Sequence, residues 1–100
     1  MLKTFHFHPA ARQELDETIH YYDSVQPGLG LDFLEEAYAT IQRILDYPEA
    51  WSTLSANTRR CLTNRFPYGL IYQIQDNGVL IVAVTHLNRK PGYWQERDPK

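Results

Sequence analysis

Hydrophobic and polar positions follow two different periods near the start of the chain. In LKTFHFH, Phe5 and Phe7 fall on one side and polar residues on the other, and this period of two predicts a half-buried strand. After Pro9, apolar residues recur every three or four positions as far as Tyr22, which predicts a helix of about four turns beginning at the proline. The proline and glycines of DSVQPGLG then predict a break.

A second apolar stripe follows this break. It runs from Phe33 to Leu45, before Pro48, and covers a wide face. This width predicts a helix that packs against both the first helix and a sheet. Because only a short break separates the two helices, we expect them to form an antiparallel hairpin.

The chain changes to strand-like patterns after Trp51. Three candidate strands follow one another: RRCLTNRFP, GLIYQIQ and VLIVAVTH, of which the last is the most apolar run in the chain. Asn77-Gly78, between the last two, predicts a tight hairpin, because a type I′ turn needs residues with positive φ. The order β-α-α-β-β-β predicts one α+β domain over residues 1–100, with the N-terminal strand and then a helical hairpin packed on a small, mainly antiparallel sheet.

Composition and cysteine content indicate the cellular compartment in which the chain is expected to function. The 100 residues are 43% hydrophobic, as in ordinary globular domains, and no apolar run approaches the roughly 20 residues of a membrane span. The first residues lack the apolar core of a secretion signal, and the single cysteine, Cys61, allows neither an intramolecular disulfide nor a cysteine-based zinc site. We therefore expect a cytoplasmic protein that contacts no membrane.

Histidines offer only a weak metal motif. His6 and His8 share one face of the first predicted strand, where they could chelate a metal, but no third ligand lies nearby in sequence. We therefore expect no metal site and no other cofactor.

Charge is divided unevenly along the chain. Residues 1–50 contain three basic and nine acidic residues, a net charge of −6, whereas residues 51–100 contain seven basic and three acidic residues, a net charge of +4. A dipolar domain of this kind can meet an anionic partner with one end and a basic partner with the other. The simpler alternative is that both ends are solvated surfaces.

Arginine and aromatic residues alternate in the C-terminal half. We expect a target-binding surface made of these side chains: Arg59, Arg60, Arg89, Tyr93, Trp94 and Arg97. Arginine beside aromatic rings suits nucleic acid, through phosphate contacts and base stacking, and it equally suits a protein interface. We expect Arg89 and Arg97 to be exposed and to pair with nothing, while Tyr93 and Trp94 could instead close the open end of the core.

Two segments resemble the RelE/ParE superfamily of bacterial type II toxins. They are RRCLTNRFPYGLIYQI and VLIVAVTHLNRKPGYW followed by Arg97, and the resemblance extends over roughly residues 3–97. Positions in the helical hairpin contribute to it: Ala11, Glu14, Leu15, Tyr21, Tyr22, Gly30, Phe33 and Glu36. The resemblance implies a small toxin that a cognate antitoxin silences within a toxin–antitoxin complex.

The segments FPYGLIYQI and PGYW resemble the ParE-like, plasmid-stabilisation branch more than the RelE branch. Membership of that branch implies growth inhibition by poisoning DNA gyrase, without a catalytic constellation. Whether two toxin chains associate stays open.

Two other functions remain alternatives. A RelE-like toxin would cleave mRNA on the ribosome, and the matching catalytic residues would be Arg65, His86, Arg89 and Tyr93. An isoelectric point near 6.0 fits poorly with docking into ribosomal RNA. The second alternative is a non-toxic relative that only binds an antitoxin.

Two of these residues also have structural interpretations. His86 ends the apolar run in phase with Leu80, Val82 and Val84, so it could simply cap a buried strand. Arg65 could pair with a carboxylate of the helices, such as that of Glu14 or Glu36.

Overall fold

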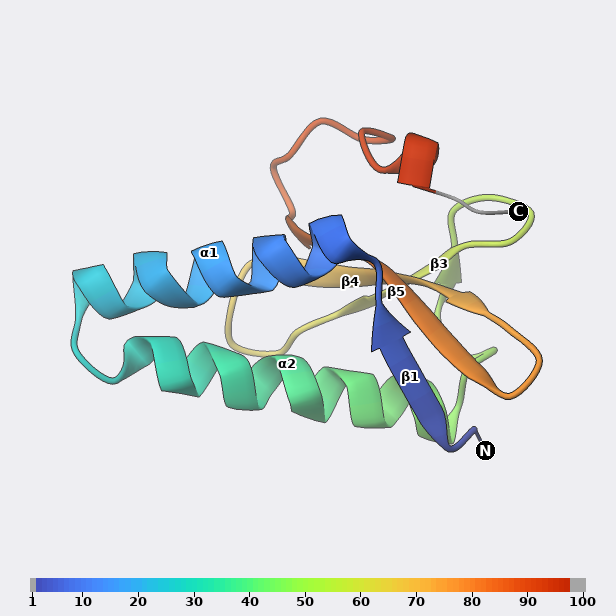
Figure 1. The fold of residues 1–100 in the computed structure, drawn as a ribbon, viewed down its shortest axis with the longest axis horizontal. Coiled ribbons are helices and arrows are strands. Elements are labelled where there is room, and N and C mark those ends of the chain that lie inside the picture. The colour runs from blue at the N-terminus through green and yellow to red at the C-terminus, as the bar shows by residue number, and fades with distance from the viewer. Residues whose placement is uncertain (1, 98–100) are drawn as a thin grey trace.

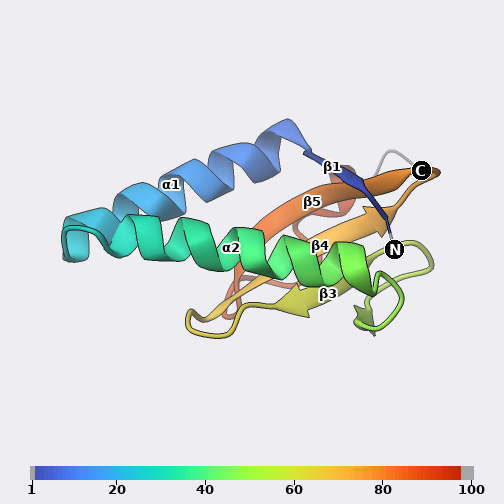
Figure 2. The ribbon, with the colours of Figure 1, turned by 90° about the horizontal axis from the view of Figure 1, so that it is seen from below.

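Two helices pack on one face of a five-stranded sheet in the computed structural model, which describes residues 2–97 (Figures 1 and 2). The elements in chain order are β1 (Thr4–Phe7), α1 (Pro9–Val25), α2 (Leu29–Asp46), β2 (Ser52–Thr53), β3 (Arg59–Leu62), β4 (Tyr68–Ile74), β5 (Gly78–His86) and the 3₁₀ turn η1 (Gln95–Arg97). Neither helix is long and apolar enough to cross a bilayer.

The sheet has the strand order β1-β5-β4-β3-β2. β1 runs parallel to β5, and the other three pairs are antiparallel. The predicted α+β order and the mainly antiparallel sheet are therefore confirmed. β2 was not predicted, because two residues are too short to show a period.

The chain passes from β1 into α1 through a side-chain cap. His8 follows the strand as the N-cap of α1, and its Nδ1 accepts a hydrogen bond of 3.0 Å from the backbone N–H of Ala10. Pro9 occupies the first helical position, where its missing N–H costs nothing. His8 is thus committed to starting the helix.

The two helices are joined more tightly than the sequence pattern predicts. Asp23 Oδ1 accepts hydrogen bonds from the N–H groups of Gly28 (3.1 Å) and Gly30 (3.0 Å). This carboxylate satisfies free donors at the start of α2, so α2 begins at Leu29 rather than near Phe33, and α1 continues to Val25. A Cβ atom on Gly30 would lie 2.5 Å from the Ile19 carbonyl oxygen, so the helices cross where only glycine fits.

An aromatic cluster joins the helical hairpin to the sheet. Tyr22, Phe33, Phe66 and Tyr68 contact one another with ring centroids 4.8–6.2 Å apart. Three of these contacts are edge to face and two are tilted, and aromatic pairs of this kind stabilise beyond the area they bury. This cluster belongs to the main core between helices and sheet.

A β-bulge in β5 changes which residues face the helices. Ile71 pairs with Ala83 and the next residue of β4, Tyr72, pairs with Ile81, so Val82 is an extra residue. Leu80 and Val82 therefore belong to a second core on the other face of the sheet, whereas Val84 belongs to the helix-facing core. The predicted in-phase stripe from Leu80 through Val84 to His86 is wrong for this reason.

The segment after β3 turns earlier than predicted. The strand expected over RRCLTNRFP ends at Leu62, and residues 63–67 form a turn. Thr63 Oγ1 donates a hydrogen bond of 2.6 Å to the Phe66 carbonyl oxygen, and the N–H of Tyr68 donates to the same oxygen at 2.8 Å. These local bonds replace the pairing of a longer strand.

The hairpin between β4 and β5 forms where Asn77-Gly78 predicts it. The N–H of Gln75 donates to the Gly78 carbonyl oxygen at 2.8 Å, so Asp76 and Asn77 occupy the turn and Gly78 begins β5. The φ of Gly78 is outside the left-handed region, so the predicted reason for this glycine is wrong. A Cβ atom there would collide with the carbonyl and hydroxyl oxygens of Thr4, so glycine lets β1 approach.

Tyr72 and Arg59 hold the segment between α2 and β3 against the sheet. The hydroxyl of fully buried Tyr72 donates a hydrogen bond of 2.5 Å to the Pro48 carbonyl oxygen. Arg59 Nη1 donates to the carbonyl oxygens of Glu49 (2.9 Å) and Trp51 (3.0 Å). Burial raises the pKa of Tyr72 to about 12.

The helix crossing at Gly30 gives the first testable prediction. We expect Gly30→Ala to lower the free energy of unfolding by about 1–3 kcal/mol, because the added methyl group forces the two helices apart. Chemical denaturation measures this change. Glu35→Ala, on an exposed position of the same helix, is the control and should stay within about 0.5 kcal/mol of the wild type. Equal stability of both variants would contradict the close crossing.

Tyr72 gives a prediction for alkaline pH. The folded protein holds the phenol proton more tightly than the unfolded chain, so the stabilisation from this group is complete below pH 10 and is lost as the pH rises through about 12. We expect the free energy of unfolding to fall between about pH 10 and 12, and to fall less steeply in Tyr72→Phe. Urea denaturation at several pH values measures both slopes, and identical slopes would refute this origin of the pH dependence.

Candidate target-binding site

The residues after β5 return across the sheet face that the helices leave free. Trp94 is only 6% exposed and packs with Ile71, Leu80, Val82 and Ala83 in the second core. The alternative in which Trp94 closes the core is therefore the one that the structure supports. We call residues 87–97 the tail; Figure 1 shows it rising from the end of β5 to η1.

A buried carboxylate on α1 fastens the tail. Glu14 Oε1 accepts hydrogen bonds from Arg97 Nη1 (2.9 Å) and from the N–H of Val84 (3.0 Å). Glu14 Oε2 accepts from Arg97 Nη2 (2.9 Å) and from the Tyr93 hydroxyl (2.8 Å). The side chains of Arg97 and Glu14 are only 17% and 12% exposed, so the expectation of a free, exposed Arg97 is wrong. The hydrogen bonds to Glu14 also raise the pKa of Arg97.

The shape of the sheet explains why Glu14 and Arg97 meet. β1 ends where Phe7 pairs with Ile81, and β5 continues without a neighbour on that side. The Val84 N–H finds Glu14, and the Val82 carbonyl oxygen accepts a hydrogen bond of 3.2 Å from Arg97 Nη1. The ion pair thus satisfies the unpaired edge of β5.

Tyr93 is held between this ion pair and a second arginine. The guanidinium carbons of Arg89 and Arg97 lie 3.9 Å and 5.0 Å from the ring centroid, a cation–π arrangement. Burial, with a contribution from the hydrogen bond to Glu14, raises the pKa of Tyr93. Its phenol is therefore a poorer proton donor than a free tyrosine, and its ring is already covered by cations.

Four of the predicted target-binding residues line one depression of about 340 Å³. They are Arg60, Arg89, Tyr93 and Trp94, and His86 and Lys90 also line it. We call it the basic depression.

Arg60 reaches the basic depression from β3. It pairs with Ile71 across the sheet, and its Cγ and Cδ would lie only 3.1–3.2 Å from a Cβ atom on Gly69. The glycine therefore lets this long side chain lie flat against β4.

Three other candidate arginines do not line the basic depression: Arg97, which binds Glu14, and also Arg59 and Arg65. Arg59 is bound to backbone carbonyl groups, as described above. Arg65 Nη2 is 3.6 Å from an Asp32 carboxylate oxygen, and its guanidinium lies over the Phe66 ring. Asp32 belongs to α2, so the expected pairing of Arg65 with a helix carboxylate is confirmed, although the partner is neither Glu14 nor Glu36. The Glu36 carboxylate accepts a hydrogen bond of 2.6 Å from the Asn64 N–H instead.

The four residues of the nuclease alternative are accordingly divided. His86, Arg89 and Tyr93 line the basic depression, whereas Arg65 lines none of the depressions described here. His86 Nδ1 accepts a hydrogen bond of 3.0 Å from the Asn88 N–H, and its ring lies 5.2 Å from that of Tyr68.

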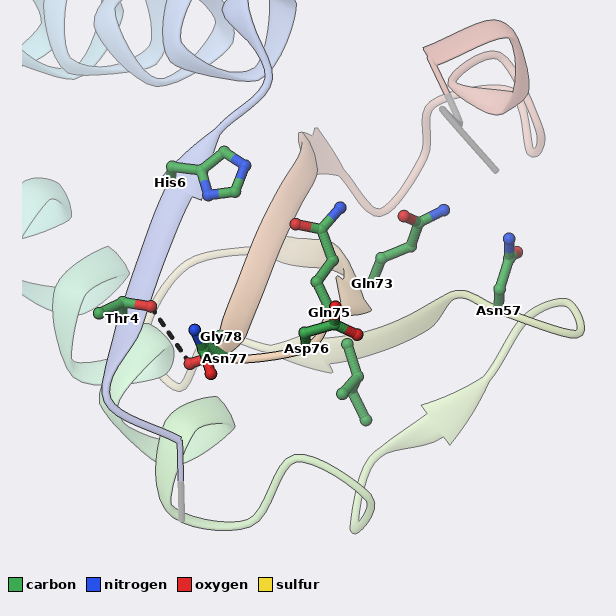
Figure 3. A pocket seen from close by; sticks show the side chains of 9 residues that line it. Thr4, His6, Asn57, Gln73, Gln75, Asp76, Asn77 and Gly78 are labelled. Carbon is green, nitrogen blue, oxygen red and sulfur yellow. Dashed lines mark hydrogen bonds between the residues drawn. The ribbon is translucent and has the colours of Figure 1, made fainter.

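A second depression, of about 520 Å³, lies at the opposite end of the sheet (Figure 3). Thr4 and His6 of β1 line it together with the β4–β5 hairpin, and Thr4 Oγ1 donates a hydrogen bond of 3.2 Å to the Asn77 carbonyl oxygen. Asp76 is its single carboxylate and His6 its single imidazole. No group of three or more His, Cys, Asp or Glu side chains that could hold a metal ion occurs among residues 2–97.

Sequence reasoning missed the central position of Glu14. It is one of nine acidic residues in the first half of the chain, and its spacing does not distinguish it from the others. Its partners, Tyr93 and Arg97, are 79 and 83 residues away in sequence. Lys90 was also missed as a lining residue, although it lies beside Arg89 within the predicted basic tail.

Comparisons with known proteins agree with the resemblance stated above. Residues 5–91 match the model of a family described as the ParE toxin of the type II toxin–antitoxin system parDE. A solved structure described as the chromosomal ParDE TA system from P. aeruginosa is similar, with a TM-score of 0.73 over 85% of this chain and 96% of that chain. At 11% sequence identity, this similarity shows the fold alone. No curated protein sequence matches the chain.

The ion pair gives a prediction for stability. We expect Arg97→Ala to lower the free energy of unfolding by about 3 kcal/mol, because the Glu14 carboxylate is then buried without its cation. Arg12→Ala breaks an exposed pair with Asp16, and this control should cost less than about 1 kcal/mol. A double-mutant cycle with Glu14→Gln measures the coupling. No coupling between Glu14 and Arg97 would contradict the fastening role.

Proposed function

Because the chain belongs to the ParE toxin family of type II toxin–antitoxin systems, we propose that it inhibits growth by binding DNA gyrase through the basic depression, and that a cognate antitoxin neutralises it. The toxin would act in the cytoplasm, where gyrase and its DNA are found, and loss of the antitoxin with a plasmid would release it.

The observation that carries this proposal is the concentration of positive charge in the basic depression. Arg60, Arg89 and Lys90 line it, although the whole chain has a net charge of −2. Within residues 2–97, the Arg89 guanidinium contacts the Tyr93 ring and makes no hydrogen bond. An exposed arginine fixed by an aromatic ring, beside a buried tryptophan, is typical of a binding hot spot.

The residues of the nuclease alternative support binding over catalysis. Cleavage of RNA needs a proton acceptor, a proton donor and cations around one phosphate. Tyr93 already donates its proton to Glu14, and Arg65 pairs with Asp32 outside the depression. A gyrase poison of this kind would need only the binding surface.

The charge division of the chain suits an antitoxin that contacts both ends. Acidic residues predominate before residue 51, which includes both helices, and basic residues surround the depression. An antitoxin with basic residues over the helices, or acidic residues over the depression, would complement these surfaces. A stable complex should bury more than about 1,000 Å².

Arg89 provides the test of the target. We expect Arg89→Ala to abolish growth inhibition while changing the free energy of unfolding by no more than about 0.5–1 kcal/mol, since only the contact with Tyr93 is lost. Inducing the wild-type chain in cells without antitoxin should trap cleaved DNA on gyrase and leave translation intact at first. Arg12→Ala is the matched control and should remain toxic.

Three results would overturn the proposal. Full toxicity of Arg89→Ala would exclude the basic depression as the target-facing surface. Cleavage of mRNA in the ribosomal A site, lost in His86→Ala or Arg65→Ala, would favour the RelE-like alternative. A chain that binds antitoxin but never arrests growth would be the non-toxic relative.

A further inference from the structure

The basic depression contains positive charge without a counter-charge. Three cationic side chains and the His86 imidazole line it, and no aspartate or glutamate among residues 2–97 does so. Arg97, by contrast, pairs with the Glu14 carboxylate. The fold therefore neutralises the buried Arg97 but leaves the cations of the depression without a carboxylate partner. Like charges held close together attract an anion.

Arg60 carries an unmet hydrogen-bond donor. Its Nε is buried and has no hydrogen-bond partner in the described part of the chain. A buried donor without an acceptor is costly, and this cost is removed if an acceptor arrives. The position of the side chain along Gly69 keeps the guanidinium beside the depression.

The geometry of arginine selects the kind of anion. Nε–H and one Nη–H of a guanidinium form a fork that matches the two oxygens of a carboxylate or a phosphate. Arg89 has one face of its guanidinium over the Tyr93 ring at 3.9 Å, which orients the group and leaves its N–H edge free to donate. Arg60 and Arg89 both line the depression, so both guanidinium groups are available to an oxyanion that binds there.

The walls of the depression favour a protein segment over nucleic acid. Leu54 and Leu87 line it with 40% and 43% of their surface exposed, and such apolar walls suit aliphatic side chains. Trp94 is buried and the Tyr93 ring is covered by cations, so neither of the large aromatic rings of the depression is free to stack on a base. A long polyanion would also meet the acidic half of the chain.

We propose that the basic depression binds a carboxylate-bearing protein segment, in which an aspartate or glutamate is flanked by aliphatic residues. Arg60 and Arg89 donate hydrogen bonds to the carboxylate, and Leu54 and Leu87 contact the aliphatic residues on either side of it. This deepens the proposed function by giving the chemistry of the segment that gyrase presents, and the identification with gyrase rests on that function.

Peptide binding to the whole chain tests the carboxylate site without gyrase. The probe is acetyl-Ala-Leu-Asp-Leu-Ala-amide, and the control probe replaces its aspartate with asparagine. Titration followed by nuclear magnetic resonance should shift the Arg60 Nε–H signal, and the control probe should bind at least tenfold more weakly. Arg60→Lys keeps the charge but removes the fork, and it should weaken binding of the aspartate probe at least tenfold. Arg12→Lys should leave binding unchanged.

Several outcomes would overturn the inference. They are unchanged affinity in Arg60→Lys, equal binding of both probes, absence of peptide binding, and preference of the depression for a short DNA duplex over the peptide. Assays of gyrase supercoiling separate this inference from the proposed function. If Arg60→Lys loses the peptide but still inhibits gyrase, the carboxylate site stands and its assignment to gyrase fails. If the wild type binds the peptide but does not inhibit gyrase, only the proposed function fails.

Discussion

Strand β5 continues for five residues beyond its pairing with β1, and the backbone groups of this stretch must find hydrogen-bond partners elsewhere. Glu14 reaches down from α1 to accept from Val84, and Arg97 reaches back from the tail to donate to Val82. Because the two side chains also pair with each other, one ion pair closes the open edge of the sheet and fastens three segments of the chain.

This closure decides where the tail lies, and with it the candidate site. Once Arg97 is fixed to Glu14, residues 87–97 must cross the sheet face away from the helices, where Trp94 fills the second core. The bulge at Val82 supports this arrangement, because it turns both Val82 and Ala83 toward the tryptophan. The same crossing places Arg89 and Lys90 beside Arg60, a residue 29 positions earlier in the chain. The basic depression is therefore a consequence of how the edge of β5 is satisfied.

Much of the fold could be predicted because its signals are local. The alternation around Phe5 and the apolar stripes of the two helices follow from which positions are buried, and each is readable within about ten residues. The alternation of arginine and aromatic residues in the C-terminal half also allowed a binding surface to be predicted there. What could not be predicted was which of its arginines are free: Arg59 binds carbonyl groups, Arg97 binds Glu14, and Arg60 and Arg89 face the depression. All four are chemically alike, and their partners come from other elements.

The sequence by itself determined the order of the elements, the family resemblance and the division of charge. Hydrophobic periodicity, sequence motifs and composition can each be read from residues that are close together in the chain. Tertiary structure alone decided that Gly78 serves the approach of β1 rather than a left-handed turn, and that Glu14 fastens the tail through Arg97. Both results depend on contacts between residues more than 70 positions apart. No local pattern encodes such contacts, since they arise only when the sheet is assembled and its unpaired backbone groups and buried charges must be satisfied together.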